Sequence, residues 1–189
     1  MQGQTNPGAP SPQDNIDRWR GVHAQALRLA QHLREASVVF RRYAGELKYH
    51  PQTGLHGDIG QDLHSAAASI RETLAAVGII TSRWDEEIAW LRSLNAGMPV
   101  DHIQRGHAAA REAARLLKTT LDVFDRAVRE PEAAPLDAPY GHGAPRRVHP
   151  GAQCTWVAER AEGLARDLST VVLLKENLLL TMKPTSQRG

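Results

Sequence analysis

The 189-residue sequence predicts an all-α protein, an antiparallel up-down-up-down four-helix bundle with long helices. In four long segments, apolar residues recur in steps of three, four or seven, which is the period of one helix face. A short connection joins the first two segments, and this favours antiparallel packing of the helices that it links. Aromatic residues make up only 5% of the chain, so a sheet protein is not expected.

The first predicted helix spans residues 14–49. Residues 1–13 are rich in Gly, Pro, Gln and Ser and are expected to form a disordered lead-in. Asp14 or Asn15 is the expected N-terminal cap, and Pro51 ends the helix because it disfavours helical geometry in the residue before it. The predicted buried face consists of Ile16, Trp19, Val22, Ala26, Leu29, Leu33, Ala36, Phe40, Tyr43 and Leu47.

The second predicted helix spans residues 58–95, with Asp58 as its cap, after a turn at residues 51–57. Folding this hairpin about residue 54 places Phe40 near residues 66–68 and Trp84 near Ala26, so that large side chains face small ones. The predicted buried face consists of Ile59, Leu63, Ala66, Ile70, Leu74, Val77, Trp84, Ile88 and Leu91.

The third predicted helix spans residues 100–130, after a glycine C-cap at Gly97 and a proline at position 99. Its first half is rich in alanine, so another backbone can approach it closely. Its predicted buried residues are Ile103, Ala110, Ala114, Leu117, Leu121, Phe124 and Val128.

The fourth predicted helix spans residues 153–182 and is followed by a frayed tail at residues 183–189. The preceding residues 131–152, rich in Pro and Gly, are expected to be a disordered or loosely draped loop, with a binding loop as the alternative. The predicted inward residues of this helix are Val157, Ala161, Leu164, Leu168, Val171 and Leu178.

Charge and composition indicate a soluble cytoplasmic protein with no membrane partner. The chain has a formal net charge of +2, one cysteine, and neither a secretory signal nor an apolar run long enough to span a bilayer. The first helix is basic, with Arg20, Arg34 and Arg41 on one side. We expect these arginines to pair within the chain, as the register places Arg18 and Arg20 near the acidic run 85–87. Nucleic-acid binding by this basic face is the weaker alternative.

Six side chains gather at one end of the predicted bundle and raise the possibility of a metal site. They are His50, His56, His64, His142, His149 and Cys154. Bundle metal sites use inward Glu-x-x-His pairs, and the chain contains none. We therefore expect no metal and no cofactor. A metal-binding or small-molecule-binding bundle, with or without enzymatic activity, remains the alternative that these residues support.

Cys154 is a candidate nucleophile, because a thiol at a helix N-terminus has a lowered pKa. The alternative is an unreactive thiol packed beneath Trp156. No Ser-His-Asp order, phosphate-binding loop or paired-carboxylate motif accompanies it. The sequence therefore favours a protein that is not an enzyme.

Three apolar pairs point away from the predicted core. They are Ile79 with Trp90, Leu27 with Val38, and Leu173 with Leu180. Several outward apolar pairs, one of them including a tryptophan, are typical of an interaction surface. The sequence therefore predicts a scaffold, adaptor or regulatory protein that binds a protein partner or a second copy of itself.

Overall fold

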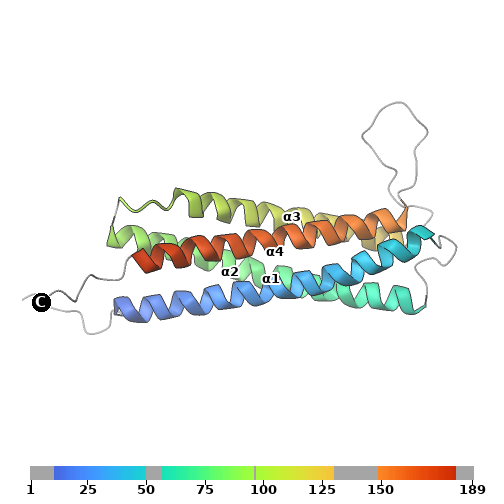
Figure 1. The fold of residues 1–189 in the computed structure, drawn as a ribbon, viewed down its shortest axis with the longest axis horizontal. Coiled ribbons are helices and arrows are strands. Elements are labelled where there is room, and N and C mark those ends of the chain that lie inside the picture. Colours follow the sequence, from blue (N-terminus) through green and yellow to red (C-terminus); the bar gives the residue numbers. More distant parts are fainter. Residues whose placement is uncertain (1–10, 50–56, 96, 130–148, 182–189) are drawn as a thin grey trace, which may run out of the picture.

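In the computed structural model, residues 11–49, 57–95, 97–129 and 149–181 are described. They form four helices, α1 (Pro12–Tyr49), α2 (Asp58–Leu94), α3 (Asp101–Arg129) and α4 (Pro150–Thr181). Figure 1 shows them running side by side along one elongated bundle, and no strand occurs in these residues. The predicted all-α four-helix bundle is therefore confirmed.

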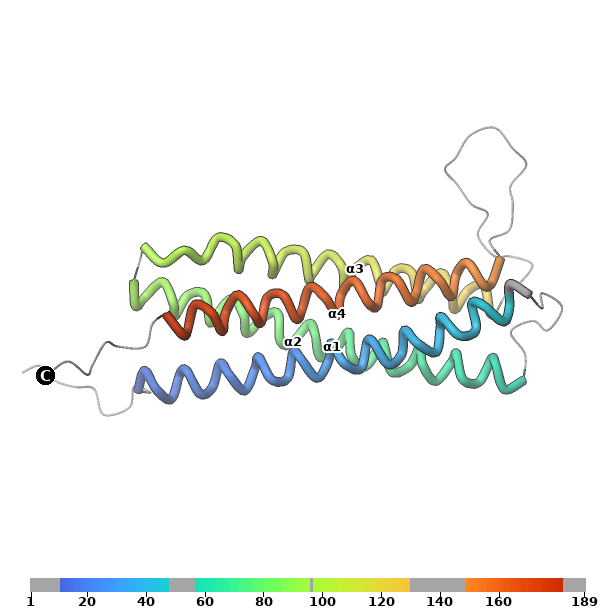
Figure 2. The backbone as a smooth tube through the Cα atoms, in the orientation of Figure 1, coloured from blue at the N-terminus to red at the C-terminus, as the bar shows by residue number. Residues whose placement is uncertain are grey.

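The helices form a ring in which α1 contacts α2 and α4, and α3 also contacts α2 and α4. The tube in Figure 2 shows α1 and α4 alongside each other over most of their length. None of the four helices is long and apolar enough to cross a membrane. The predicted lead-in and tail, and most of the predicted long loop, lie outside the described residues.

The N-terminus of α1 differs from the prediction. Its cap is Ser11, whose hydroxyl accepts a hydrogen bond from the Asp14 amide at 3.1 Å, while the Ser11 amide donates to the Asp14 carboxylate at 2.9 Å. This reciprocal pair is a capping box, and Pro12 fits the first helical position because its missing amide hydrogen has no intrahelical partner there. Neither Asp14 nor Asn15 is the cap.

The bounds of the other helices lie close to the predicted ones, with one larger difference. Helix α2 starts at Asp58, but its cap is Gly57, which has a φ of 66°. Helix α4 begins at Pro150, three residues before the predicted start, because proline is well suited to a first helical turn. The connection before α4 is correspondingly shorter than the predicted 131–152.

Most of the predicted apolar residues are buried in the core, whereas Ile16, Ile59, Leu74, Ala114 and Val128 are only half-buried. Phe40 of α1 meets Phe124 of α3 edge-to-face, with 5.3 Å between ring centroids, across the middle of the bundle. The predicted hairpin register agrees with two contacts between α1 and α2. Arg18 pairs with Glu86 at 2.7 Å near one end, and the Tyr43 hydroxyl donates a hydrogen bond to Asp62 near the other.

Two details of α4 depend on its packing against its neighbours. Leu178, predicted to point inward, is only half-buried, whereas Lys175 and Leu179 are buried. The predicted close approach to the alanine-rich half of α3 is present. A Cβ atom added to Gly106 would lie only 2.7 Å from Val171 Cγ2, so α3 and α4 meet closely at this glycine.

Candidate functional site

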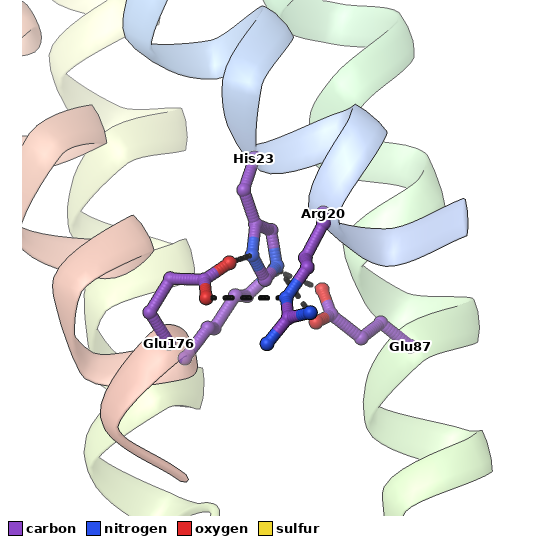
Figure 3. A network of polar contacts seen from close by, with 5 residues as sticks. Arg20, His23, Glu87 and Glu176 are labelled. Carbon is purple, nitrogen blue, oxygen red and sulfur yellow. Dashed lines mark hydrogen bonds and ion pairs between the residues drawn. The ribbon is translucent and has the colours of Figure 1, made fainter. Parts of the chain in front are cut away.

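Charged side chains lie buried where α1, α2 and α4 meet. Glu87 of α2 lies between His23 of α1 and Lys175 of α4. Arg20 and Glu176 lie at the more exposed edge of the same group (Figure 3). These five residues are called the buried charge cluster below.

Every charge in the cluster faces one of opposite sign. Glu87 accepts a hydrogen bond from Lys175 Nζ at 2.5 Å and lies 2.8 Å from His23 Nε2. The other ring nitrogen of His23 lies 2.5 Å from Glu176, which Arg20 approaches to 3.8 Å. The cluster therefore links three helices by charge-assisted contacts.

Burial and ion pairing have opposite effects on the pKa values of Glu87 and Lys175. Burial disfavours the carboxylate of Glu87, but hydrogen bonds and attraction from His23 and Lys175 outweigh it, so the pKa of Glu87 lies below its ordinary value. Burial lowers the pKa of Lys175 to about 8, because attraction by Glu87 offsets only part of the desolvation. Glu87 and Lys175 are therefore both charged at neutral pH.

Two aromatic side chains contact the cluster. Lys175 Nζ lies 4.2 Å from the centre of the Trp84 ring, which is a cation–π distance, and Trp84 stacks on His107 of α3 at 4.7 Å. Burial, together with repulsion from Lys175, lowers the pKa of His107 to about 3. His107 is therefore neutral, and its Nε2 has no hydrogen-bond partner among the described residues.

The geometry of the cluster fits a structural role. A general acid or base must come within hydrogen-bond reach of its substrate. The exposed side-chain fractions of His23, Glu87 and Lys175 are only 2%, 0% and 0%, so solvent and substrate are excluded. Paired buried charges are costly to separate, and they therefore fix how the three helices meet.

An accessible groove lies between α1 and α2. Its volume is about 830 Å³, and it follows α1 from Leu29 to Tyr43 and α2 from Asp62 to Thr73. These segments span about 16–21 Å at roughly 1.5 Å per residue. Leu29, Ala36, Val39 and Ala66 line it with apolar groups, whereas Ser65 and Ser69 add small polar ones. We call this feature the α1–α2 groove.

Charged side chains border the α1–α2 groove on both helices. Glu35 and Arg42 lie on the α1 side, and Asp62 and Glu72 lie on the α2 side. Arg42 forms an ion pair with Glu46 of its own helix at 3.2 Å. The three carboxylates of the groove, those of Glu35, Asp62 and Glu72, have no ion-pair partner in the part of the chain that the structure describes.

The predicted outward apolar residues are exposed with one exception. Exposed side chains are found at Leu27, Val38, Ile79, Leu173 and Leu180. Trp90 was expected to face outward, but it is half-buried, and its ring lies 6.5 Å from that of Trp19. The large indole reaches sideways onto α1, which a helical wheel of α2 alone does not show. Only Val38 lines the α1–α2 groove.

The histidines of the predicted metal site are not assembled by the described helices. His64 and His149 are exposed, while His50, His56 and His142 lie outside the described residues. The helices that are described contain no group of three or more His, Cys, Asp or Glu side chains placed to hold a metal ion.

Cys154 lies near the start of α4, as expected for a candidate nucleophile, but its surroundings oppose that role. The thiol is buried, and burial raises its pKa to about 12. The thiolate that reacts with electrophiles is therefore scarce at neutral pH. These surroundings favour the unreactive alternative.

The basic side of α1 is turned towards α4. Arg41 pairs with Glu162 at 2.5 Å, Arg34 donates a hydrogen bond to Ser169 at 2.8 Å, and Arg20 reaches Glu176 of the cluster. Partners within the chain therefore engage the three arginines on which nucleic-acid binding would depend. These partners lie on α4, whereas of Arg18 and Arg20, both expected near the acidic run 85–87, Arg18 pairs with it and Arg20 pairs with Glu176.

Two features of the molecule were not predicted. The buried charge cluster was missed because Glu87 was considered only as part of the acidic run 85–87 near Arg18 and Arg20, and Lys175 was given no role. A signal was present, since Lys175 lies four residues from both Val171 and Leu179, on the buried face. The α1–α2 groove has no such signal, because it depends on the distance between two helices.

Comparison of the chain with protein-family models, curated proteins and solved structures finds no significant match.

Proposed function

We propose that this chain is a non-enzymatic protein-interaction bundle, with a scaffold, adaptor or regulatory role in the cytoplasm, and that it binds its partner in the α1–α2 groove. The observation that carries the proposal is the groove itself, about 830 Å³ of open space with an apolar floor and a polar rim. A helix docking its apolar face into such a groove is a recurring mode of peptide recognition.

The contact between α1 and α4 differs from that between α1 and α2, and the difference supports this assignment. The α1–α4 contact is closed by ion pairs and hydrogen bonds, including Arg41 with Glu162. Between α1 and α2, the groove residues Ala36, Ala66 and Ser69 are small, so they leave space that a partner's side chains can fill. Filling that space removes apolar surface from water, which is the main source of affinity in such contacts.

Self-association through the exposed apolar pairs is the second route to the same function. Leu173 and Leu180 lie on one outer face of α4, seven residues apart, and Ile79 lies on the outside of α2. Exposed apolar side chains that recur on one helix face are typical contact points between subunits.

A small-molecule-binding bundle remains the second candidate function, because the groove volume of about 830 Å³ suits a single ligand. Ligand pockets in proteins commonly enclose about 300–1,000 Å³. Native mass spectrometry of the purified chain distinguishes the two candidates. A stoichiometric small-molecule adduct supports this second function, whereas its absence combined with a protein adduct in the next experiment supports the first.

Site-specific photo-crosslinking tests the proposed function. A photoreactive residue is placed at Ser65 in the groove and, as a matched control, at Ser82, because both are exposed serines of α2 that hydrogen-bond to their own helix. We expect a discrete protein adduct from position 65 in cells that express the gene natively, and none from position 82. Equal crosslinking at both positions, or none at position 65, contradicts the proposal.

A further inference from the structure

We propose that the occupant of the α1–α2 groove is a cationic amphipathic helix of a partner protein. This inference rests on the proposed function and names the chemistry of the partner. Its basis is the combination of an apolar floor with carboxylates on both sides of the groove.

The charge on the groove is negative and is only partly compensated within the described helices. Glu35 of α1 and Asp62 and Glu72 of α2 form no ion pair there. Glu35 accepts a hydrogen bond from Gln31 at 3.0 Å, and Asp62 accepts one from the Tyr43 hydroxyl and is attracted by Arg42. The positive charge of Arg42 is shared with Glu46. A partner must therefore face three carboxylates, with His32 the only other titratable side chain of the lining besides Tyr43 and Arg42.

This local charge is opposite in sign to that of the whole chain. The protein has a formal net charge of +2, and in the groove between α3 and α4 the charges of Arg160 and Arg166 are matched by those of Glu159 and Asp167. An anionic partner is therefore repelled by the α1–α2 groove. Complementary charge steers encounter and selects the partner, so this groove favours a cationic one.

The shape of the groove selects a helix among cationic partners. The groove follows its two walls for about 16–21 Å at roughly 1.5 Å per residue, which is three to four turns of an added helix. Apolar side chains spaced i, i+3 or i+4, and i+7 on that helix would lie over Leu29, Ala36, Val39 and Ala66. Lysine or arginine side chains flanking this apolar stripe would reach Glu35 on one side and Glu72 on the other.

Two designed helical peptides with the same leucine stripe test the inference, one with lysine and one with glutamate at the flanking positions. Fluorescence anisotropy measures their binding to the full chain. We expect the wild type to bind the lysine peptide at least tenfold more tightly than the glutamate peptide. The double variant Glu35→Lys and Glu72→Lys should lose at least tenfold in affinity for the lysine peptide.

Matched variants separate specific docking from general attraction. Asp17→Lys with Glu159→Lys makes the same change in net charge outside the groove, and Asp17, like Glu35, accepts a hydrogen bond from a glutamine of its own helix. This variant should bind the lysine peptide as the wild type does. Ser65→Trp fills the groove and should block binding, whereas Ser82→Trp should not.

The possible failures are distinct. Equal affinity for both peptides, abolished by Ser65→Trp, overturns the cationic specificity but leaves the proposed function standing. Binding that is insensitive to Ser65→Trp, or no binding of either peptide, contradicts the groove as the interaction site and therefore both proposals. Sedimentation of the chain alone should show no dimer that depends on the groove. A salt-sensitive dimer that Ser65→Trp dissociates would identify a second copy as the occupant and overturn the inference.

Discussion

Glu87 of α2 accepts a hydrogen bond from Lys175 of α4 at 2.5 Å, and neither side chain is exposed to solvent. Two charges placed in the core of a bundle stabilise it only while they remain together, because each alone would be buried without compensation. With His23, this pair links α1, α2 and α4.

Removing one member of this pair should be strongly destabilising. Lys175→Met keeps the length and apolar stem of the side chain but leaves Glu87 without its cation, so we expect a loss of about 3–5 kcal/mol in the free energy of unfolding. Urea denaturation measures it. Arg18→Met at the exposed pair with Glu86 is the control and should cost less than about 1 kcal/mol. A loss in Lys175→Met as small as the control's would show that the pair does not hold the helices.

The double variant Glu87→Met and Lys175→Met tests the coupling between the two residues. Because it removes both buried charges, it should lose less stability than the sum of the two single variants. Additive losses in a double-mutant cycle would mean that the two side chains act independently.

His107 should make folding sensitive to acid. Its pKa falls from 6.5 to about 3 on folding because the ring is buried, so the folded state binds fewer protons than the unfolded state between these values. The stabilisation of the neutral ring is therefore complete above pH 6.5 and is lost as the pH falls towards 3, by up to about 1.4 kcal/mol per pH unit. The lowered pKa of Glu87 adds a further loss below pH 4.5.

The variant His107→Phe isolates this effect, since it keeps a ring against Trp84 but cannot take up a proton. Urea denaturation at pH 7 and at pH 5 should give a smaller loss of stability for the variant than for the wild type. Equal losses would assign the acid sensitivity to other groups.

Replacing each of two helical glycines by alanine should change the stability of the protein in different ways. Nothing lies within 4 Å of a Cβ added at Gly78, so Gly78→Ala should raise stability by about 0.5–1 kcal/mol through helix propensity. At Gly106 the added methyl would lie 2.7 Å from Val171, so Gly106→Ala should gain nothing or lose stability. Thermal denaturation compares them, and a similar gain at both positions would contradict the close contact of α3 with α4.

Cys154 should be inert in the folded protein. Because burial raises its pKa to about 12, an aromatic disulfide reagent at pH 7.5 should modify it only as fast as the protein unfolds. Adding denaturant should make the reaction fast. Rapid modification of the native protein would revive the candidate nucleophile.

The helices and the core could be predicted because periodicity is a local property of the sequence. The steps from Trp19 to Leu47 identify one buried face of α1, and Trp84 and Leu91 do the same for α2. The helix boundaries were predicted less accurately. Ser11 and Pro150 start their helices through capping and the geometry of the first turn, which the apolar pattern does not show. Trp90 was misplaced because its side chain spans the gap to a neighbouring helix.

Polar contacts between distant parts of the sequence could not be predicted from local periodicity. That His23 meets Glu87 and Lys175 depends on the register of three helices, and a charged residue within a sequence is ordinarily solvated. The α1–α2 groove likewise results from the spacing of two helices whose facing residues, such as Ala36 and Ala66, are small.

The most direct test of the account is to observe which methyl groups respond when the lysine peptide is added to the full chain. Two-dimensional methyl NMR should show shifts at Ala36, Val39 and Ala66 in the α1–α2 groove, and none at Ala113 and Leu116 between α3 and α4. Shifts confined to the second pair, or spread evenly over both, would contradict the claim that this groove is the interaction site.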